Sequence, residues 1–292
     1  MNPIHNPEKI AILLDSCADL SSRQIKGKPI YLTPLRILCG NREYLDGENI
    51  DNEDVYRRQA KGELPHTSLP SPERVVTALD RLRKDGYEKV IALPLSSGVS
   101  GTYNMVKLEC AEREDLETAV FDTKSASLGI SLVALQIVED IQAGMSWQTL
   151  VEERVPYLLE NTTPYFSVDT LEFLQKGGRI GKVTAVAGTL LNIKPILGFA
   201  EDGQLTSVAK VRGSKAIYAK FLELIRGHLG ESKCFNLAVA NGGNPEGMAE
   251  LKTLLTQTFP GYNTLLESKM DATLATYVGK GMLGVAVQVL DR

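Results

Sequence analysis

The chain has 292 residues, of which 43% are hydrophobic and 23% are charged. This composition is typical of a globular protein that can bury a core without metals or disulfides, and it excludes disorder as the main state. The 32 Lys and Arg residues and 36 Asp and Glu residues give a net charge of −4, which argues against the strongly basic face of a nucleic-acid-binding protein.

Short apolar segments alternate with amphipathic segments over the first half of the chain. This alternation predicts an α/β fold with a parallel sheet flanked by helices, because parallel strands need helical crossovers. The expected strands are Lys9–Leu14, Pro29–Leu38, Lys89–Leu95 and Thr118–Phe121, and the expected helices are Asn52–Lys61, Ser71–Lys84, Ser100–Arg113, Ser127–Ala143 and Ser146–Leu159.

The order of elements changes after the linker-like stretch from Asn161 to Pro164. We therefore expect an N-terminal α/β domain over residues 1–161 and a C-terminal α/β domain with a mixed sheet over residues 162–292. An Asp-Gly turn at residues 202–203 predicts an antiparallel hairpin. The expected strands are Pro164–Val168, Lys194–Phe199, Gln204–Arg212, Phe235–Ala240 and two or three closing strands, and the expected helices are Thr170–Lys176, Lys182–Leu191, Ser214–Leu229 and Pro245–Thr256.

No segment is expected to enter or cross a membrane. The longest uncharged stretch, Val90 to Val106, contains serines, glycines and a proline, whereas a membrane span needs ~20 mainly apolar residues. The N-terminal segment is polar and lacks the apolar core of a signal peptide. The four cysteines show no CxxC spacing and are expected to be free thiols. These features favour a cytoplasmic location.

Several catalytic and cofactor motifs are missing. The three histidines form no HExxH or His-Cys cluster, so no metal site is expected, and no GxSxG elbow is present. Residues 177–182 resemble a phosphate loop, but the glycine spacing is too short and Val183 replaces the magnesium-binding Ser or Thr. A GxGxxG match at residues 279–284 is followed by too few residues for a dinucleotide-binding unit. No cofactor is therefore predicted.

Hydroxyl-rich loops dominate the remaining polar residues. Ligands bind at the carboxyl ends of strands in parallel α/β sheets, and hydroxyl and amide donors there suit an anion. Each loop on its own is also explained by helix capping, whereas the set together favours a shared binding site. The loops are Asp15–Asp19, His66–Pro72, Ser96–Thr102 and Asp122–Ser127.

The same loops carry a resemblance to a known family. The chain resembles the DegV family of bacterial fatty-acid-binding proteins, and the likeness runs from Ile10 to the last expected strand. Residues 15–20 (Asp-Ser-Cys-Ala-Asp-Leu), 67–71 (Thr-Ser-Leu-Pro-Ser) and 96–103 (Ser-Ser-Gly-Val-Ser-Gly-Thr-Tyr) are similar to three of its motifs. Two further likenesses are residues 171–180 (Leu-Glu-Phe-Leu-Gln-Lys-Gly-Gly-Arg-Ile) and 191–197 (Leu-Asn-Ile-Lys-Pro-Ile-Leu).

The resemblance implies a carrier that holds a fatty acid in a buried tunnel and presents it to a partner fatty acid kinase. It implies a carboxylate held by the hydroxyl loops, and a face for the kinase that contains two arginines. The family histidine of a closing Gly-x-His-x-Gly-Pro-Gly segment is replaced by tyrosine, and the proline by Lys280. The implied ligand-binding residues are Thr67, Ser68, Ser96, Ser97 and Tyr277, and the implied partner-binding residues are Arg179 and Arg212.

Two other functions stay open on the residues alone. An acyl transferase or hydrolase needs a nucleophile with a base, and the nearest pair is Ser96 or Ser97 with His66. A binder of a different small anionic or lipid ligand, without kinase coupling, is the main alternative, because tyrosine at position 277 donates only a neutral hydrogen bond where a histidine can carry charge. Hydroxyl donors without a catalytic base favour the non-enzymatic carrier.

Overall fold

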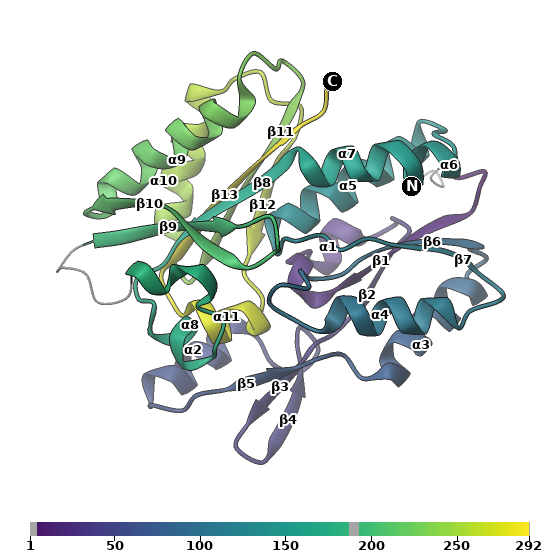
Figure 1. Ribbon diagram of the computed structural model, residues 1–292, viewed down its shortest axis with the longest axis horizontal. Coiled ribbons are helices and arrows are strands. Elements are labelled where there is room, and N and C mark those ends of the chain that lie inside the picture. Colours follow the sequence, from purple (N-terminus) through teal and green to yellow (C-terminus); the bar gives the residue numbers. More distant parts are fainter. Residues whose placement is uncertain (1–4, 187–192, 292) are drawn as a thin grey trace.

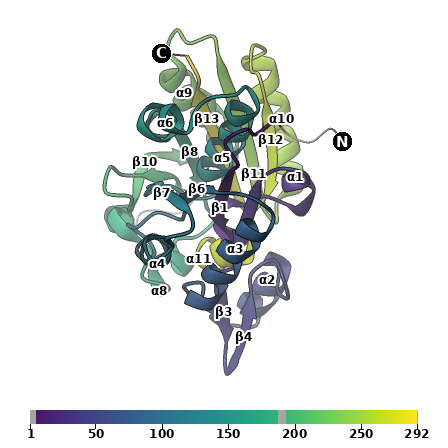
Figure 2. The ribbon, with the colours of Figure 1, turned by 90° about the vertical axis from the view of Figure 1, so that its right-hand side faces the viewer.

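The computed structural model describes residues 5–186 and 193–291. Two main sheets and three sets of helices alternate in five layers, which Figure 1 shows from the right of the molecule to the upper left. The middle layer of helices lies between the sheets and packs against both of them. A small third sheet projects below these layers (Figure 2).

The first main sheet has four parallel strands in the order β2-β1-β6-β7. Successive side chains of a strand point to opposite faces, and β1 is buried on both of them. Ala11 and Leu13 pack under α3 and α4, whereas Ile12 and Leu14 pack against α5 and α7. The elements are β1 (Ile10–Asp15), β2 (Ile30–Thr33), β6 (Lys89–Leu93), β7 (Glu117–Val120), α3 (Pro72–Lys84), α4 (Thr102–Ala111), α5 (Leu128–Gln142) and α7 (Val155–Glu160).

The second main sheet is mixed, with the order β10-β9-β8-β13-β11-β12. Only the β11–β12 pair is parallel among its described strand pairs. Helices α9 and α10 cover one face, and α5 packs on the other beside Ala240 and Ala286. The elements are β8 (Thr162–Ser167), β9 (Ile193–Phe199), β10 (Leu205–Arg212), β11 (Phe235–Gly242), β12 (Leu265–Lys269), β13 (Met282–Val289), α9 (Ser214–Leu229) and α10 (Pro245–Thr258).

The third sheet is antiparallel, with the order β4-β3-β5, and it places residues 66–68 beside the closing segment of the chain. That segment contains a short helix, α11, which packs against α2, α8 and the third sheet. The elements are β3 (Arg36–Cys39), β4 (Arg42–Leu45), β5 (His66–Ser68), α1 (Ser22–Ile25), α2 (Asn52–Ala60), α6 (Trp147–Thr149), α8 (Glu172–Lys176) and α11 (Ala272–Val278), with short helical turns at Ser16–Ala18, Leu150–Arg154 and Gly181–Val186.

The α/β class, the parallel sheet, the mixed sheet and the hairpin of β9 and β10 are confirmed. The expected strand Pro29–Leu38 is wrong, because it divides at Pro34 into β2 and β3, which belong to different sheets. The sequence predicts only strands after α10, and this is wrong because the helix α11 lies between β12 and β13. The expected helix Lys182–Leu191 begins as the turn Gly181–Val186, and its remainder lies outside the described residues.

The domain boundary at residue 161 stays a prediction. It falls between β7, the last strand of the parallel sheet, and β8, the first strand of the mixed sheet. Helix α5 belongs to the N-terminal half of the sequence, yet it packs against β8, β11 and β13 as well as the parallel sheet.

Candidate functional site

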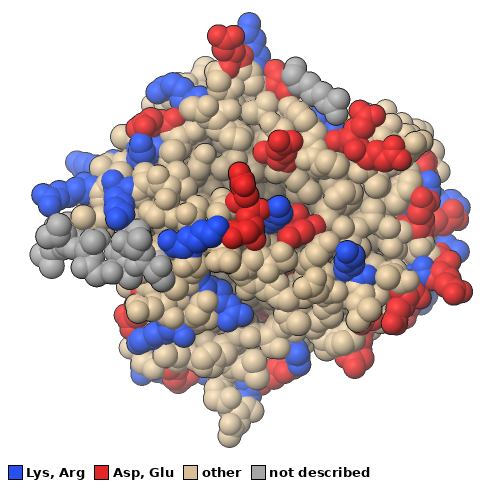
Figure 3. All heavy atoms as spheres, in the orientation of Figure 1, with Lys and Arg blue, Asp and Glu red and all other residues tan. Residues whose placement is uncertain are grey.

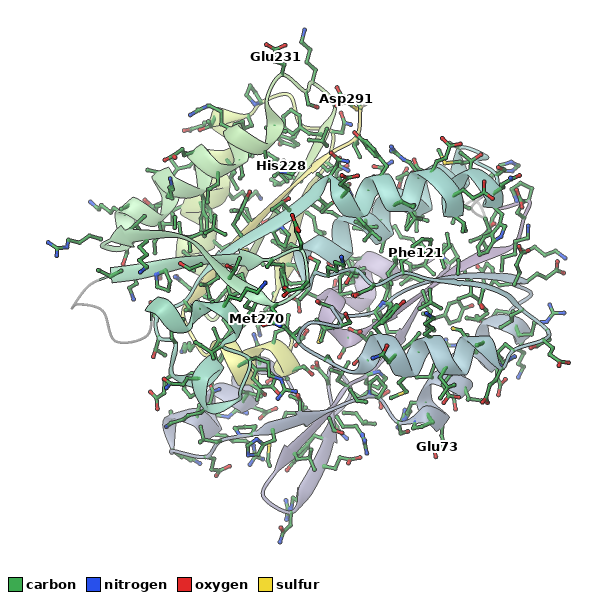
Figure 4. All side chains as sticks on the ribbon, viewed as in Figure 1. Glu73, Phe121, His228, Glu231, Met270 and Asp291 are labelled. Atoms are coloured by element: carbon green, nitrogen blue, oxygen red, sulfur yellow. The ribbon has the colours of Figure 1, made fainter. Side chains whose placement is uncertain are left out.

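An apolar cavity lies at the centre of the molecule, with walls from β8, β9, β13, α11 and the loops that follow β6 and β7. A volume of about 100 Å³ is open to the centres of water molecules. Met270, labelled in Figure 4, belongs to the wall beside α11. Most wall residues are aliphatic or aromatic, and they include Leu35, Leu95, Leu128, Phe166, Leu174, Phe199, Leu274 and Met282. This narrow, apolar space fits a thin hydrocarbon chain.

Three polar side chains meet on the wall of this cavity. The hydroxyl oxygens of Thr67 and Tyr277 lie 2.6 Å apart and form a hydrogen bond. The guanidinium of Arg179 lies 4.9 Å from the centroid of the Tyr277 ring. All three residues line the cavity. The structure therefore brings together two of the residues singled out in the sequence as ligand-binding and one singled out as partner-binding, from three separate elements.

Helix α11 positions Tyr277. Asp271 caps the start of the helix, and its carboxylate accepts a hydrogen bond of 2.6 Å from the backbone amide of Leu274. Thr273, Leu274, Tyr277 and Val278 then share the face of the helix that lines the cavity. The tyrosine ring lies against Gly177 at the end of α8.

Arg179 links the end of α8 to the loop Ser96–Thr102, which we call the serine-rich loop. Its Nη1 donates to the carbonyl of Gly177 at 2.9 Å, and its Nε donates to the carbonyl of Val99 at 3.3 Å. Arg179 also lines an adjoining hollow, where a volume of about 290 Å³ is open to the centres of water molecules. The other residues there are Gly98, Val99, Ser100, Gly101, Gly178, Gly181, Gln204 and Leu205. An arginine carries its charge at every physiological pH, so this wall has a permanent cation.

The remaining hydroxyls singled out in the sequence have partners elsewhere. Ser68 follows Thr67 on β5, so it points to the other face, and its hydroxyl accepts a hydrogen bond of 3.0 Å from Arg36. Buried Ser96 donates to the carbonyl of Gly203 at 2.8 Å, and exposed Ser97 donates to Asp122. These three serines are absent from the cavity wall. Their role in binding stays a prediction.

The contact between Ser96 and Gly203 is part of a close approach of two loops. A Cβ on Gly98 would lie 2.3 Å from the carbonyl carbon of Gly203, and a Cβ on Gly203 would lie 2.2 Å from the hydroxyl of Ser96. The turn between β9 and β10 therefore rests directly on the serine-rich loop, backbone against backbone. This contact joins the mixed sheet to the loops of the parallel sheet at the edge of the cavity.

Other hydroxyl residues of the wall are not among the ligand-binding residues expected from the sequence, although Ser100 and Ser127 belong to two of the hydroxyl-rich loops. Ser100 is bonded to Thr102 at 2.8 Å between hydroxyl oxygens, and Ser127 donates to Asp19. Thr273 lines the cavity from α11, and its hydroxyl has no hydrogen-bond partner among the described residues. Ser100 stands inside a family-like motif, which is a usable signal. No sequence signal marks Thr273, because the helix that carries it is not predicted.

Buried aspartates hold the start of α11. Asp46 accepts hydrogen bonds from the backbone amides of Ala272 at 3.0 Å and Thr273 at 3.2 Å. The backbone amide of Asp271 donates to the carboxylate of Asp19 at 2.7 Å, and burial raises the pKa of Asp19 to about 7 and the pKa of Asp271 well above its usual range.

A neighbouring aspartate is held in the same loop of the parallel sheet. Burial also raises the pKa of Asp15 to about 7, against the opposing effect of hydrogen bonds from the backbone amides of Leu95 and Cys17. The amide of Leu95 lies 2.6 Å from the Asp15 carboxylate, and Leu95 lines the cavity. Asp15 therefore ties the end of β1 to the start of the serine-rich loop.

The serine–histidine pair that an acyl-transfer enzyme needs is not formed. Within residues 5–186 and 193–291, neither Ser96 nor Ser97 is hydrogen-bonded to a histidine. His66 is exposed on β5, and His228 lies in the last turn of α9, apart from Met270 in the cavity wall (Figure 4). The nitrogens of His228 instead contact Thr163 and the carbonyl of Asn161, both at 3.3 Å.

The described part of the chain contains neither a metal-binding cluster nor a membrane-spanning helix. No group of three or more His, Cys, Asp or Glu side chains there could hold a metal ion. None of the helices in that part is both long enough and apolar enough to span a bilayer.

Arg212 lies away from the other site residues. It is exposed at the far end of β10, and the strand from Leu205 on the cavity wall to Arg212 spans roughly 23 Å. Lys210 and Lys215 are exposed near it. Figure 3 shows basic side chains gathered at the left of the molecule, where β9, β10 and α9 lie in the same view. The structure thus separates Arg212 from Arg179.

Lys280 is exposed and does not line the cavity.

Comparisons with known proteins agree on one family. A family model described as an uncharacterised protein of the DegV family matches residues 9–289. A DegV domain-containing protein of Clostridium perfringens is 36% identical over 285 residues, which cover 96% of this chain and 99% of the relative.

Two solved structures are similar over nearly their whole length. A DegV family protein from Thermus thermophilus, described as binding fatty acid, has a TM-score of 0.90 and 28% identity, and the match covers 97% of this chain and 100% of that chain. DegV from Bacillus subtilis, described as a fatty acid binding protein, has a TM-score of 0.86 and 26% identity, with 97% and 99% coverage.

Proposed function

Because this chain belongs to the DegV family, we propose that it binds a long-chain fatty acid in the central cavity and acts as a carrier without catalytic activity. The observation that carries the proposal is an apolar cavity on whose wall Thr67, Tyr277 and Arg179 meet. The similar proteins described as fatty acid binding support the same ligand class. No resident cofactor is part of the proposal.

The apolar wall supplies most of the affinity in this proposal. Burial of each methylene group contributes about 0.8 kcal/mol, so a chain of about fourteen contributes on the order of 11 kcal/mol before the costs of association. Those costs remove several kcal/mol, and enough remains for tight binding. A small polar anion would gain nothing from Leu128, Phe166 or Phe199, so the wall favours the fatty acid over that alternative.

The carboxylate is assigned to the polar side of the wall. The hydroxyls of Thr67 and Tyr277 would donate to it, and Arg179 would balance its charge. A buried carboxylate needs such partners, because leaving it unpaired is strongly unfavourable. Ser68, Ser96 and Ser97 remain in the proposal as further donors, and each would exchange its present partner, Arg36, Gly203 or Asp122, for the ligand.

The test is mass spectrometry of organic extracts from freshly purified protein. Wild type is expected to carry a fatty acid near one equivalent. Thr67→Val and Tyr277→Phe each remove one hydrogen bond to a charged group, which contributes roughly 1.5–3 kcal/mol, so retention is expected to fall about tenfold or more. Thr276→Val is the matched control, because the Thr276 hydroxyl donates to the carbonyl of Ala272 on the same helix and does not line the cavity.

Two results would count against the proposal. If folded wild-type protein carries no lipid and takes up none from added fatty acid, the ligand is not a fatty acid. Other small anions would then be tested. If Thr67→Val and Tyr277→Phe both retain the fatty acid fully, a fatty acid is still the ligand, but its carboxylate does not bind at Thr67 and Tyr277.

Presentation of the acyl group to a partner kinase is the finer part of the proposal. Arg179 supports it, because this residue lines both the cavity and the adjoining hollow, where a phosphoryl donor could approach the carboxylate. Arg212 and its basic neighbours on the exposed edge strand β10 offer a separate surface for the kinase. The partner would then contact this chain without entering the cavity.

Arg212→Ala tests that surface. The variant is expected to keep its bound fatty acid but to support at least tenfold slower acyl phosphate formation by a purified bacterial fatty acid kinase with ATP and Mg²⁺. Arg23→Ala removes an exposed arginine from α1 and serves as the control. The rates are compared at a kinase concentration below saturation. Equal rates for wild type and Arg212→Ala would show that Arg212 does not contact the kinase.

A further inference from the structure

Thr273 is an unusual member of the cavity wall. Its hydroxyl has no hydrogen-bond partner within residues 5–186 and 193–291, and the residue is 2% exposed, so bulk water does not supply the missing hydrogen bond. Of the buried polar atoms without a partner in the described part of the chain, this hydroxyl is the one whose residue lines the cavity. A buried donor without a partner is unfavourable, and one in a binding cavity calls for a ligand atom.

The neighbouring hydroxyls on the wall do not share this property. Thr67 is bonded to Tyr277, Ser100 is bonded to Thr102, and Ser127 is bonded to Asp19. Among the serine and threonine hydroxyls that line the cavity in the described part of the chain, the unpaired state is therefore particular to Thr273.

Hydrogen bonds to carboxylates hold the backbone around Thr273 in place. The amides of Ala272 and Thr273 both donate to the carboxylate of Asp46, and the amide of Leu274 donates to Asp271. Valine has nearly the shape of threonine without the hydroxyl group. A wall position that met only methylene groups would be better occupied by valine.

The position of Thr273 on α11 places it along the acyl chain and away from the head group. Thr273 precedes Tyr277 by four residues, which is about one helical turn of 5.4 Å, and both residues face the cavity. The assigned carboxylate lies at the Tyr277 hydroxyl. A ligand oxygen that reaches Thr273 therefore belongs to the chain itself.

We propose that the cavity takes a fatty acid with an oxygen substituent on its chain, a hydroxyl or oxo group, and that Thr273 binds this oxygen. The inference rests on the proposed fatty acid site. The threonine hydroxyl donates to an oxo group, and it donates to or accepts from a hydroxyl group. An unsubstituted fatty acid still fits, but it leaves Thr273 unpaired.

The experiment compares affinities for stearic acid and for a set of monohydroxystearic acids that differ in the position of the hydroxyl group, with lipid-free protein. Wild type is expected to bind one isomer about tenfold more tightly than stearic acid. Thr273→Val is expected to lose that preference while it still binds stearic acid, and Thr273→Ser is expected to keep it. Thr276→Val, with a hydroxyl already bonded to the Ala272 carbonyl, is expected to behave as wild type.

The outcomes separate the two proposals. Wild type that binds stearic acid but prefers no hydroxylated isomer would overturn the role of Thr273 and leave the fatty acid site standing. A preference that survives in Thr273→Val would overturn it as well. Wild type that binds neither stearic acid nor any isomer would remove the fatty acid site, and this inference with it.

Discussion

Tyr277 shows how a single side chain organises the polar side of the cavity. Its hydroxyl meets Thr67, its ring lies under the guanidinium of Arg179, and its edge lies against Gly177. In the family pattern a histidine occupies this position and can carry charge. Here the charge comes from Arg179, which contacts the tyrosine ring, so the site keeps a cation although the side chain at position 277 is neutral.

Gly177 gives a direct test of that arrangement. A Cβ at this position would lie 2.4 Å from Cδ1 and 2.5 Å from Cε1 of Tyr277, so Gly177→Ala displaces the ring. We expect fatty acid affinity to fall about tenfold in a protein that is still folded, since the φ of −80° at this residue accepts alanine. Isothermal titration with stearic acid measures the change.

Gly178 supplies a control with the opposite expected effects on stability and affinity. Gly178 has a φ of +72° and an open environment, so Gly178→Ala strains the backbone without touching the ring. It should lower thermal stability more than Gly177→Ala does and lower affinity less. Equal affinity of Gly177→Ala and wild type would show that the ring position does not matter for binding.

At the scale of elements, the sequence predicts what local patterns encode. Strands β1 and β6 and helices α3 and α5 stand close to their expected bounds, because an apolar run or an amphipathic repeat defines each of them. The ends of strands predict that the hydroxyl-rich loops Asp15–Asp19, Ser96–Thr102 and Asp122–Ser127 meet at one edge of the sheet, whereas Thr67 and Ser96 are implied as binding residues by the family resemblance. Family-like motifs add Tyr277 and Arg179.

Elements that depend on distant contacts are harder to predict. Helix α11 has seven residues, too few for a periodic signal, and its start depends on Asp46, which is distant in the sequence. The division of β2 from β3 follows from their membership of two sheets, and no local pattern shows this. The partners of Ser96 and Ser97, Gly203 and Asp122, come from other loops in the same way.

At the scale of the whole molecule, buried aspartates join parts that are far apart in the chain. Asp19 follows β1, Asp46 follows β4, and Asp271 precedes α11. The amide of Asp271 donates to Asp19 at 2.7 Å, and Asp46 accepts from the start of α11. The helix that carries Tyr277 and Thr273 is therefore held by carboxyl groups from the N-terminal part of the chain.

This cluster predicts that stability depends on pH. Burial raises the pKa of Asp19 from 3.8 to about 7, so folding takes up a proton between these values. The contribution to stability is full below about pH 4 and is lost as the pH rises through about 7. The free energy of unfolding of wild type, measured with urea, should therefore be lower at pH 8 than at pH 5.

Asp19→Asn isolates the effect, because asparagine stays neutral and tolerates the φ of 53° at this position. The variant should lose less stability than wild type between pH 5 and pH 8, by on the order of a few kcal/mol, with part of the dependence retained through Asp15. Asp80→Asn, at an exposed site, is the control and should follow wild type. The same decline in Asp19→Asn and wild type would assign the pH dependence to other groups.

The meeting of Gly98 and Gly203 has a consequence for how this protein can evolve. The two loops touch through backbone atoms, and a Cβ on either glycine would lie within 2.6 Å of atoms of the other loop. A change at one position has no compensating change at the other, because glycine is already the smallest residue. Lineages that keep this architecture can therefore vary the residues that line the cavity, whereas Gly98 and Gly203, where the two loops meet, do not accept a larger residue.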